Sequence, residues 1–156
     1  GDLKRVTLKD KSAPTAITRG PDGNMWFVQT DGDRIGKVTP SGALTEYSLA
    51  SVSEPVAIVP GPDNNLLVAL AGKNTIGKLT TAGVLTQIDL PGSDVGIRGI
   101  AVDGDKSIWF TQSKTNRIGR INANGNMAEF TVPTSNSSPS TLAPVPISTR
   151  SVFAAR

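Results

Sequence analysis

One pattern of turns and short apolar stretches occurs three times in this chain of 156 residues, and this repeat constrains the fold more than any other feature. Ile35-Gly36-Lys37 recurs as Ile76-Gly77-Lys78 and Ile118-Gly119-Arg120, at spacings of 41 and 42. Trp26-Phe27 recurs at the same spacings, as Leu67-Val68 and Trp109-Phe110. A period of about 40 residues is typical of a repeat architecture.

Each unit contains turn residues about every ten positions, with short apolar or alternating stretches between them. In the first unit the turns fall at Pro21-Asp22-Gly23, Asp31-Gly32-Asp33 and Pro40-Ser41-Gly42. No window shows a sustained helical period. Four antiparallel strands in about 40 residues are typical of a propeller blade, so the sequence predicts an all-β β-propeller with about 3.5–4 four-stranded blades.

The repeat also predicts the domain organisation. We expect one domain over residues 1–156, with units at approximately 14–54, 55–96 and 97–138. Residues 1–8 are interpreted as the outermost strand of a preceding blade, and residues 139–156 as part of a fourth blade. Residues 131–146 are rich in Ser, Thr and Pro, which leaves a linker as the alternative.

Composition excludes several kinds of chemistry. The chain has no cysteine and no histidine, so thiol chemistry and the commonest general base are absent, and no catalytic residue, metal site or cofactor is predicted. The aspartates of the Pro-Asp-Gly-like turns, Asp22, Asp63 and Asp103, are assigned to turn formation rather than to calcium. The glycines in the third strands are expected to allow close approach of a neighbouring blade. Trp26 and Trp109 are expected to be buried between blades.

The charge and hydropathy patterns bear on partners. The net charge of +3 is spread along the chain, so no nucleic-acid partner is predicted. The longest apolar run, Leu66–Ala71, is too short to span a bilayer, so no membrane association is predicted. The chain begins with Gly, so we expect it to be processed or cut from a longer polypeptide. The compartment stays open, with an extracellular or cell-surface location slightly favoured; the sequon at Asn136 leaves glycosylation undecided.

From about Pro14 to Pro133 the unit resembles the repeat of the virginiamycin B lyase, or streptogramin lyase, family: a P-D-G-N turn, a W-F strand, an I-G-R/K strand and a final T-E-Y/F strand. The resemblance implies a ring of seven blades. It also implies a magnesium-assisted elimination that opens an ester in a cyclic peptide antibiotic.

The chain departs from that family where the chemistry lies. The family carries histidine after the first proline of some units, and here those positions hold Thr15, Val56, Arg98 and Ser140. The family carries acidic residues at the ends of some second strands, and here those positions hold Gln29, Leu70 and Gln112. None of these side chains serves as a general base near pH 7.

One polar face is the candidate binding surface. In a propeller the connections between second and third strands share one face with the connections between blades. Here this face carries ten candidate residues: Gln29, Asp33, Arg34, Lys73, Asn74, Arg98, Gln112, Lys114, Asn116 and Arg117. They form either a solvated rim or a net basic surface for carbohydrate, peptide or an anionic partner.

Two functions are therefore weighed. The first is a non-catalytic interaction or structural module, and the second is a lyase-type enzyme whose catalytic blades lie elsewhere. Because three and a half units leave open edges, we expect either a homodimer that completes a ring or the remaining blades of a longer chain.

Overall fold

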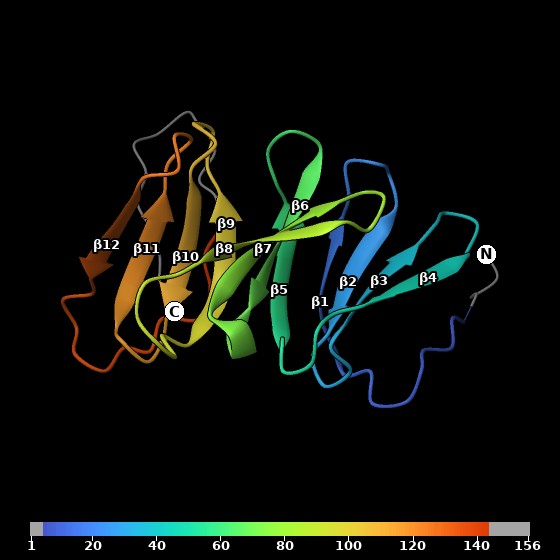
Figure 1. The fold of residues 1–156 in the computed structure, drawn as a ribbon, viewed down its shortest axis with the longest axis horizontal. Coiled ribbons are helices and arrows are strands. Elements are labelled where there is room, and N and C mark those ends of the chain that lie inside the picture. Colours follow the sequence, from blue (N-terminus) through green and yellow to red (C-terminus); the bar gives the residue numbers. More distant parts are fainter. Residues whose placement is uncertain (1–4, 144–156) are drawn as a thin grey trace.

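The computed structural model describes residues 5–143, which form three four-stranded antiparallel sheets (Figure 1). The first sheet comprises β1 (Pro14–Arg19), β2 (Met25–Gln29), β3 (Arg34–Val38) and β4 (Leu44–Ser48). The second comprises β5 (Pro55–Pro60), β6 (Asn65–Leu70), β7 (Thr75–Thr80) and β8 (Leu85–Asp89), with the short 3-10 helix η1 (Ala71–Lys73) between β6 and β7. The third comprises β9 (Ile97–Val102), β10 (Ile108–Gln112), β11 (Arg117–Ile121) and β12 (Met127–Thr131).

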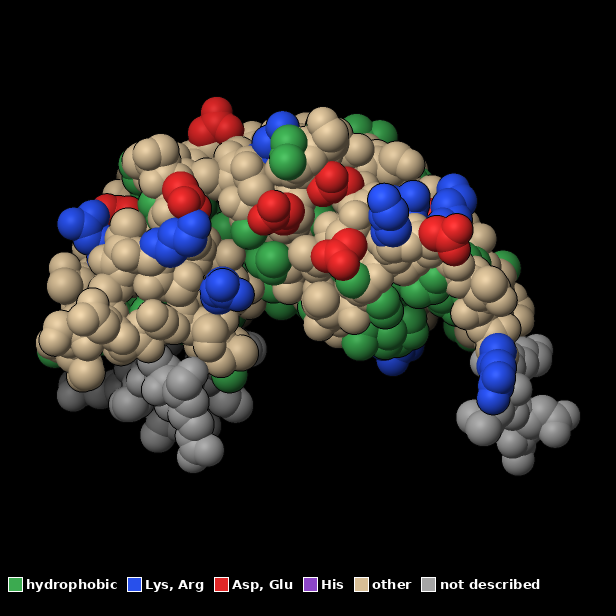
Figure 2. All heavy atoms as spheres, turned by 90° about the horizontal axis from the view of Figure 1, so that it is seen from below, with side chains coloured by type: hydrophobic (Ala, Val, Ile, Leu, Met, Phe, Trp, Pro, Cys, Tyr) green, Lys and Arg blue, Asp and Glu red, His purple; other side chains and the backbone are tan. Residues whose placement is uncertain are grey.

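Each sheet is a simple meander in which sequential strands are hydrogen-bonded neighbours. Each therefore has the topology of a propeller blade, and we number the sheets blades 1, 2 and 3. Among the first strands, β1 contacts β5 and β5 contacts β9, and the blades fan out from them into an arch (Figure 2). The predicted all-β class and four-stranded blades are confirmed, and each sheet lies inside one of the three predicted units.

Apolar side chains fill the spaces between the blades. Trp26, Val28 and Ile35 of blade 1 pack against Ile58, Leu66, Val68 and Leu79 of blade 2. Leu67, Ala69 and Ile76 of blade 2 pack against Ile100, Ile108, Phe110 and Ile121 of blade 3. Because side chains alternate along a strand, each blade presents one apolar face to the blade before it and the other to the blade after it.

The third-strand glycines have a different role from the one predicted. Gly36 is paired across the sheet with Phe27, and Gly119 with Phe110. A Cβ atom at either glycine would lie 2.1 Å from the Cζ atom of that phenylalanine. The expectation that these glycines admit a neighbouring blade is therefore wrong, because a ring of the same sheet occupies the space.

The prediction for the tryptophans is confirmed for Trp26, which is 0% exposed and stacks on Tyr47 with ring centroids 5.7 Å apart. Trp109 is only partly buried and stacks on Phe130 at 5.8 Å. The difference arises because blade 2 covers Trp26, whereas Trp109 lies in the last complete blade of the described residues.

The two ends of the arch carry segments without regular secondary structure. Residues 5–8 lie against blade 1, and residues 140–142 lie beside Gly99 of β9. A strand of an incomplete blade has no hydrogen-bonding neighbour, so the strand predicted over residues 1–8 and the partial blade over 139–156 stay predictions. Residues 1–4 and 144–156 lie outside the described residues. Within residues 5–143, no helix has the length and hydropathy of a membrane span.

Candidate functional site: the loop face and the axial groove

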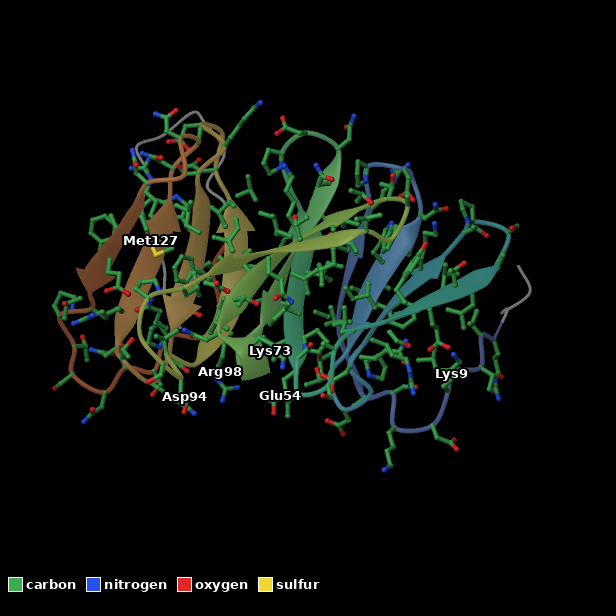
Figure 3. All side chains as sticks on the ribbon, in the orientation of Figure 1. Lys9, Glu54, Lys73, Asp94, Arg98 and Met127 are labelled. Carbon is green, nitrogen blue, oxygen red and sulfur yellow. The ribbon has the colours of Figure 1, made fainter. Side chains whose placement is uncertain are left out.

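The ten predicted residues lie on or just beneath one face of the arch, formed by the connections between second and third strands and between blades. Figure 3 places Glu54, Lys73, Asp94 and Arg98 along the same lower edge of the molecule. Figure 2 shows that acidic and basic side chains are interspersed over this face. The face is therefore of mixed charge rather than simply basic, because Glu54 and Asp94 accompany the predicted cations.

Three of the predicted residues clamp the connections between blades. Asp33, Asn74 and Asn116 occupy equivalent positions, and all three have positive φ angles, of 45°, 55° and 56°. The Asp33 carboxylate accepts the backbone N–H groups of Val52 at 2.9 Å and Glu54 at 2.8 Å. Asn74 and Asn116 also bind the following connections: their Nδ2 groups donate to backbone carbonyl oxygens, and their Oδ1 atoms accept the backbone N–H groups of Val95 and Ser137. These side chains hold the loops in place, and Asp and Asn suit the position because they tolerate the left-handed conformation.

Two further predicted residues are buried. Gln29 and Gln112 are both 0% exposed at the ends of β2 and β10. Gln29 Nε2 donates to Glu46 Oε1 at 2.8 Å, and Gln112 Nε2 donates to Glu129 Oε1 at 2.7 Å. They are placed to orient the outermost strands rather than to meet a ligand at the surface.

The predicted cations divide into paired and unpaired groups. Lys114 Nζ lies 2.6 Å from the Asp94 carboxylate, and Arg117 lies 2.9 Å from Glu129. Arg34 donates to the backbone oxygen of Asp10 at 3.3 Å. Lys73 and Arg98 are exposed and have no ion pair or hydrogen bond among residues 5–143. These two side chains are therefore available to an anion.

Lys73 belongs to a hollow between the loops of blades 2 and 3. This hollow has a volume of 580 Å³, and its charged lining residues are Glu54, Lys73, Asp89, Asp94 and Lys114. Opposite charges are close together here, so the hollow has no strong preference for a ligand of either sign.

Arg98 belongs to a different cavity, an axial groove at the inner ends of the blades. Its volume is 540 Å³, and Thr15, Val56, Arg98 and Ser140 all line it. The resemblance noted in the sequence implied histidines at these positions in some units, and the repeat brings the equivalent positions of successive blades to one place. The sequence showed that these four residues occupy equivalent positions in the repeat. The prediction grouped Arg98 with the loop residues, whereas the structure places it in this groove.

The groove does not suit a magnesium ion. Magnesium is bound by carboxylate, carbonyl or water oxygens, and none of the lining residues carries a carboxylate. Arg98 also places a fixed positive charge in the groove. No cluster of three potential ligands among His, Cys, Asp and Glu exists in the described part of the chain. We therefore derive no step through a metal.

Several structural partners were missed from the sequence. Thr30 Oγ1 donates to the Pro55 backbone oxygen at 2.7 Å and lies 2.8 Å from Thr15 Oγ1, so it links blade 1 to blade 2 beside the groove. Glu46 and Glu129 were also missed. Each follows its glutamine partner by 17 residues, and this repeated spacing is the signal that could have found them.

Two aspartates away from this face have lowered pKa values. Burial alone would raise the pKa of Asp22, but hydrogen bonds from Trp26 Nε1 and Asn24, with the nearby charge of Lys37, hold the pKa below its ordinary value. The backbone and side-chain hydrogen bonds of Ser107 lower the pKa of Asp105, and Arg120 lowers it further. Both groups stabilise turns at the edge opposite the groove.

The meandering sheets, their shared inner strands and the groove where those strands meet define a β-propeller arc. The virginiamycin B lyase family model matches residues 1–149, and the chain belongs to that family. Virginiamycin B lyase from Staphylococcus aureus is 37% identical with a TM-score of 0.87, and the match covers 93% of this chain and 50% of that one. A catalytically inactive histidine-to-alanine variant of the same enzyme, with quinupristin, is 38% identical with a TM-score of 0.86, covering 92% and 50%.

The chain thus spans about half the length of these relatives. Hydrazine synthase of Kuenenia stuttgartiensis is 20% identical with a TM-score of 0.68, covering 91% of this chain and 42% of that one, and shares the fold alone. A search of curated proteins found no match.

Proposed function

We propose that this chain is a non-catalytic binding module that holds an acidic peptide in the axial groove through Arg98. The observation that carries the proposal is the position of Arg98: it is exposed, it lines a groove of 540 Å³, and it has no anionic partner among residues 5–143. A guanidinium group presents a planar set of donors that matches a carboxylate.

The surroundings of Arg98 favour a peptide over a small ion. Val56, Ala57 and Ile100 give the groove apolar walls, while Thr15 and Ser140 supply hydroxyl groups. Apolar walls with a few convergent polar groups are typical of sites that bind organic ligands. An acidic side chain or a C-terminal carboxylate would reach Arg98 while neighbouring apolar groups contact the walls.

The absence of a base in the groove supports a non-catalytic role. Threonine, valine, arginine and serine line the positions in question, and none accepts a proton readily near neutral pH. The whole sequence contains no histidine. This contrasts with the relative whose histidine-to-alanine variant is described as catalytically inactive.

A lyase-type function is the second candidate, and family membership favours it. In that case this half-ring would hold one side of the substrate, and blades outside this sequence would provide the catalytic groups. Quinupristin, the compound named with the inactive relative, is the natural probe.

The binding proposal is tested by fluorescence anisotropy with labelled hexaglutamate, and labelled hexalysine serves as the opposite-charge probe. We expect Arg98→Ala to weaken hexaglutamate binding about 10- to 100-fold, because a hydrogen bond to a charged group contributes roughly 1.5–3 kcal/mol. Arg19→Ala is the matched control, since Arg19 is exposed at the opposite end of an equivalent inner strand. Equal affinity of wild type and Arg98→Ala would overturn the proposal.

The choice between the two functions is tested by incubating the chain with quinupristin and Mg²⁺ and following the products by mass spectrometry. A non-catalytic module leaves the cyclic compound intact. Ring-opened product from this chain alone would show that the module reading is wrong. Adding the remaining blades and then observing product would support the lyase candidate.

A further inference from the structure

The interface between blades 1 and 2 contains a stack of aromatic rings that the interface between blades 2 and 3 lacks. In blade 1, Trp26 stacks on Tyr47 with ring centroids 5.7 Å apart. Lys37 Nζ lies over both rings, 5.1 Å and 5.7 Å from their centroids. The equivalent residues of blade 2 are Leu67, Ile88 and Lys78. Blade 2 therefore has the cation of this arrangement but neither of its rings.

Blade 2 nevertheless keeps the residues that surround the tryptophan in blade 1. Asp22 Oδ1 accepts a hydrogen bond from Trp26 Nε1 at 2.9 Å, and Asp63 is the equivalent of Asp22. Gly20 leaves room for the indole, because an added Cβ would lie 2.4 Å from Trp26 Cδ1, and Gly61 is the equivalent of Gly20. The surroundings of an aromatic ring are thus present in blade 2, where the side chain is leucine.

The turn that faces this position in the next blade shows the space that the rings leave. Gly83, in the turn between β7 and β8, is covered by Tyr47, since an added Cβ would lie 2.1 Å from the ring. Gly125 is the equivalent residue, in the turn between β11 and β12. An added Cβ at Gly125 would have no heavy atom within 4 Å from any described residue other than its chain neighbours. The space that Tyr47 fills between blades 1 and 2 is therefore open between blades 2 and 3.

This space belongs to a pocket of 200 Å³ between blades 2 and 3, at the edge of the blades opposite the axial groove. Its apolar lining includes Leu67, Ile88, Ile108 and Ile121. Its charged residues are Asp63, which lies 4.0 Å from Lys78 Nζ and 3.3 Å from Lys106 Nζ, and those two lysines. One carboxylate between two ammonium groups leaves a net positive charge, which favours an anionic ligand. An apolar cavity of about 150 Å³ is large enough to bind benzene.

We propose that this pocket binds a planar aromatic acid, whose ring lies where the Trp26–Tyr47 stack lies in the preceding interface. Lys78 would lie over the face of the ligand's ring, as Lys37 and Arg120 lie over rings of their own blades. Lys106 would bind the carboxylate at the mouth of the pocket. Neither Arg98 nor the axial groove takes part, so the inference does not depend on the proposed function.

The binding is tested by titrating the isotope-labelled chain with indole-3-carboxylate and following the backbone amide signals by NMR. The largest shifts should fall at Ala123 and Gly125, which line this pocket. Largest shifts at Gly99, which lines the axial groove, would place the acid beside Arg98 and overturn the proposal. No shifts in a large excess of the acid would overturn it as well, because the pocket would then be only a gap in the packing.

Two comparisons test the role of the aromatic ring and of the cation above it. Cyclohexanecarboxylate has the same charge but no aromatic ring, so it should bind more weakly than indole-3-carboxylate. Lys78→Met should weaken binding of indole-3-carboxylate about 2- to 30-fold, the range expected for loss of a cation–π contact. Lys37→Met is the matched control, because Lys37 lies over rings of the chain itself, and it should leave the affinity unchanged. Equal affinity for the two acids, or for the two variants, would overturn the proposal.

Leu67→Trp fills the pocket from within. The new indole would lie beside Asp63, as Trp26 lies beside Asp22, so we expect a higher urea midpoint together with loss of indole-3-carboxylate binding. A folded variant that binds the acid with unchanged affinity would overturn the proposal. If Leu67→Trp fails to fold, as judged by circular dichroism, Ile88→Tyr fills the same pocket from the outermost strand, with the same expected loss of binding.

Discussion

Replacing Gly119 with alanine tests whether the third strand needs glycine at this position because the ring of the cross-strand partner Phe110 packs over it. The added Cβ would lie 2.1 Å from Phe110 Cζ, well inside ordinary van der Waals contact. Phe110 is 0% exposed and belongs to the apolar cluster between blades 2 and 3, so its ring has no free space to enter. Overpacking of this kind costs about 1–3 kcal/mol.

An opposing effect sets the net magnitude. Alanine is favoured over glycine in a strand by roughly 0.5–1 kcal/mol, because glycine loses more backbone freedom on folding. We therefore expect Gly119→Ala to lower the free energy of unfolding by about 1–2 kcal/mol. For a chain of this size, each kcal/mol lowers the Tm by about 2–4 °C.

The matched control is Gly77→Ala in blade 2, where valine rather than phenylalanine is the cross-strand partner. There the nearest atom to the added Cβ is Leu85 Cδ1 at 2.7 Å, the end of a flexible, partly buried side chain. This side chain can move, so Gly77→Ala should be close to neutral. The Phe110→Val/Gly119→Ala double variant recreates the smaller partner and should be less destabilised than the sum of its single changes.

Urea unfolding followed by circular dichroism measures all four variants. The reasoning would be refuted if Gly119→Ala and Gly77→Ala shifted the urea midpoint equally with unchanged slopes. Strict additivity in the double variant would also refute it, since the phenylalanine ring would then have no part in the cost.

Two further predictions concern the tryptophans and the turn before β2. Trp26→Ala should lower the free energy of unfolding by about 3–5 kcal/mol, because a fully buried indole is lost. Iodide should quench the fluorescence of the partly buried Trp109, measured in a Trp26→Phe variant. It should not quench Trp26, measured in a Trp109→Phe variant. Because the pKa of Asp22 is lower in the folded than in the unfolded chain, its ionised carboxylate stabilises the fold at pH values above the unfolded pKa, which is about 4. This stabilisation is lost as the pH falls through the folded pKa. Between pH 6 and pH 2, the urea midpoint should therefore fall less in Asp22→Asn than in wild type. Strong iodide quenching of Trp26 would contradict the first prediction. A urea midpoint that falls more steeply with acid in Asp22→Asn than in wild type would contradict the second.

The fold could be predicted because the same pattern of strands and turns occurs three times in the sequence. A single unit has ambiguous short strands, but equivalent turns at the constant spacing of the repeat remove the ambiguity. The strands begin at Pro14, Pro55 and Ile97, where the units were expected to begin. The role of the glycines could not be predicted in the same way, because the pattern shows that a position is constrained but not which neighbour constrains it.

The candidate site was harder to predict because polar residues in loops serve two purposes. Asp33, Asn74 and Asn116 look like ligand-binding residues in the sequence, but connections between blades contain backbone groups that need hydrogen-bond partners. The clamps meet that need. Of the predicted cations, only Arg98 and Lys73 are left without a partner among the described residues, and which cations would be neutralised depends on side-chain positions that no spacing specifies.

The buried glutamines show how comparison among units could recover such contacts. Blades 1 and 3 have glutamine at the end of the second strand and glutamate 17 residues later, and the structure joins each pair by a hydrogen bond. Blade 2 has Leu70 and Gln87 at the equivalent positions, where Leu70 is 0% exposed and Gln87 is exposed. Both members change together, because a buried glutamine needs a partner and a leucine does not. Three copies in one chain thus act as a small alignment in which paired substitutions reveal a contact. They show that Gln29 and Gln112 have partners inside their own blades, whereas Arg98 has no hydrogen-bond or ion-pair partner among residues 5–143.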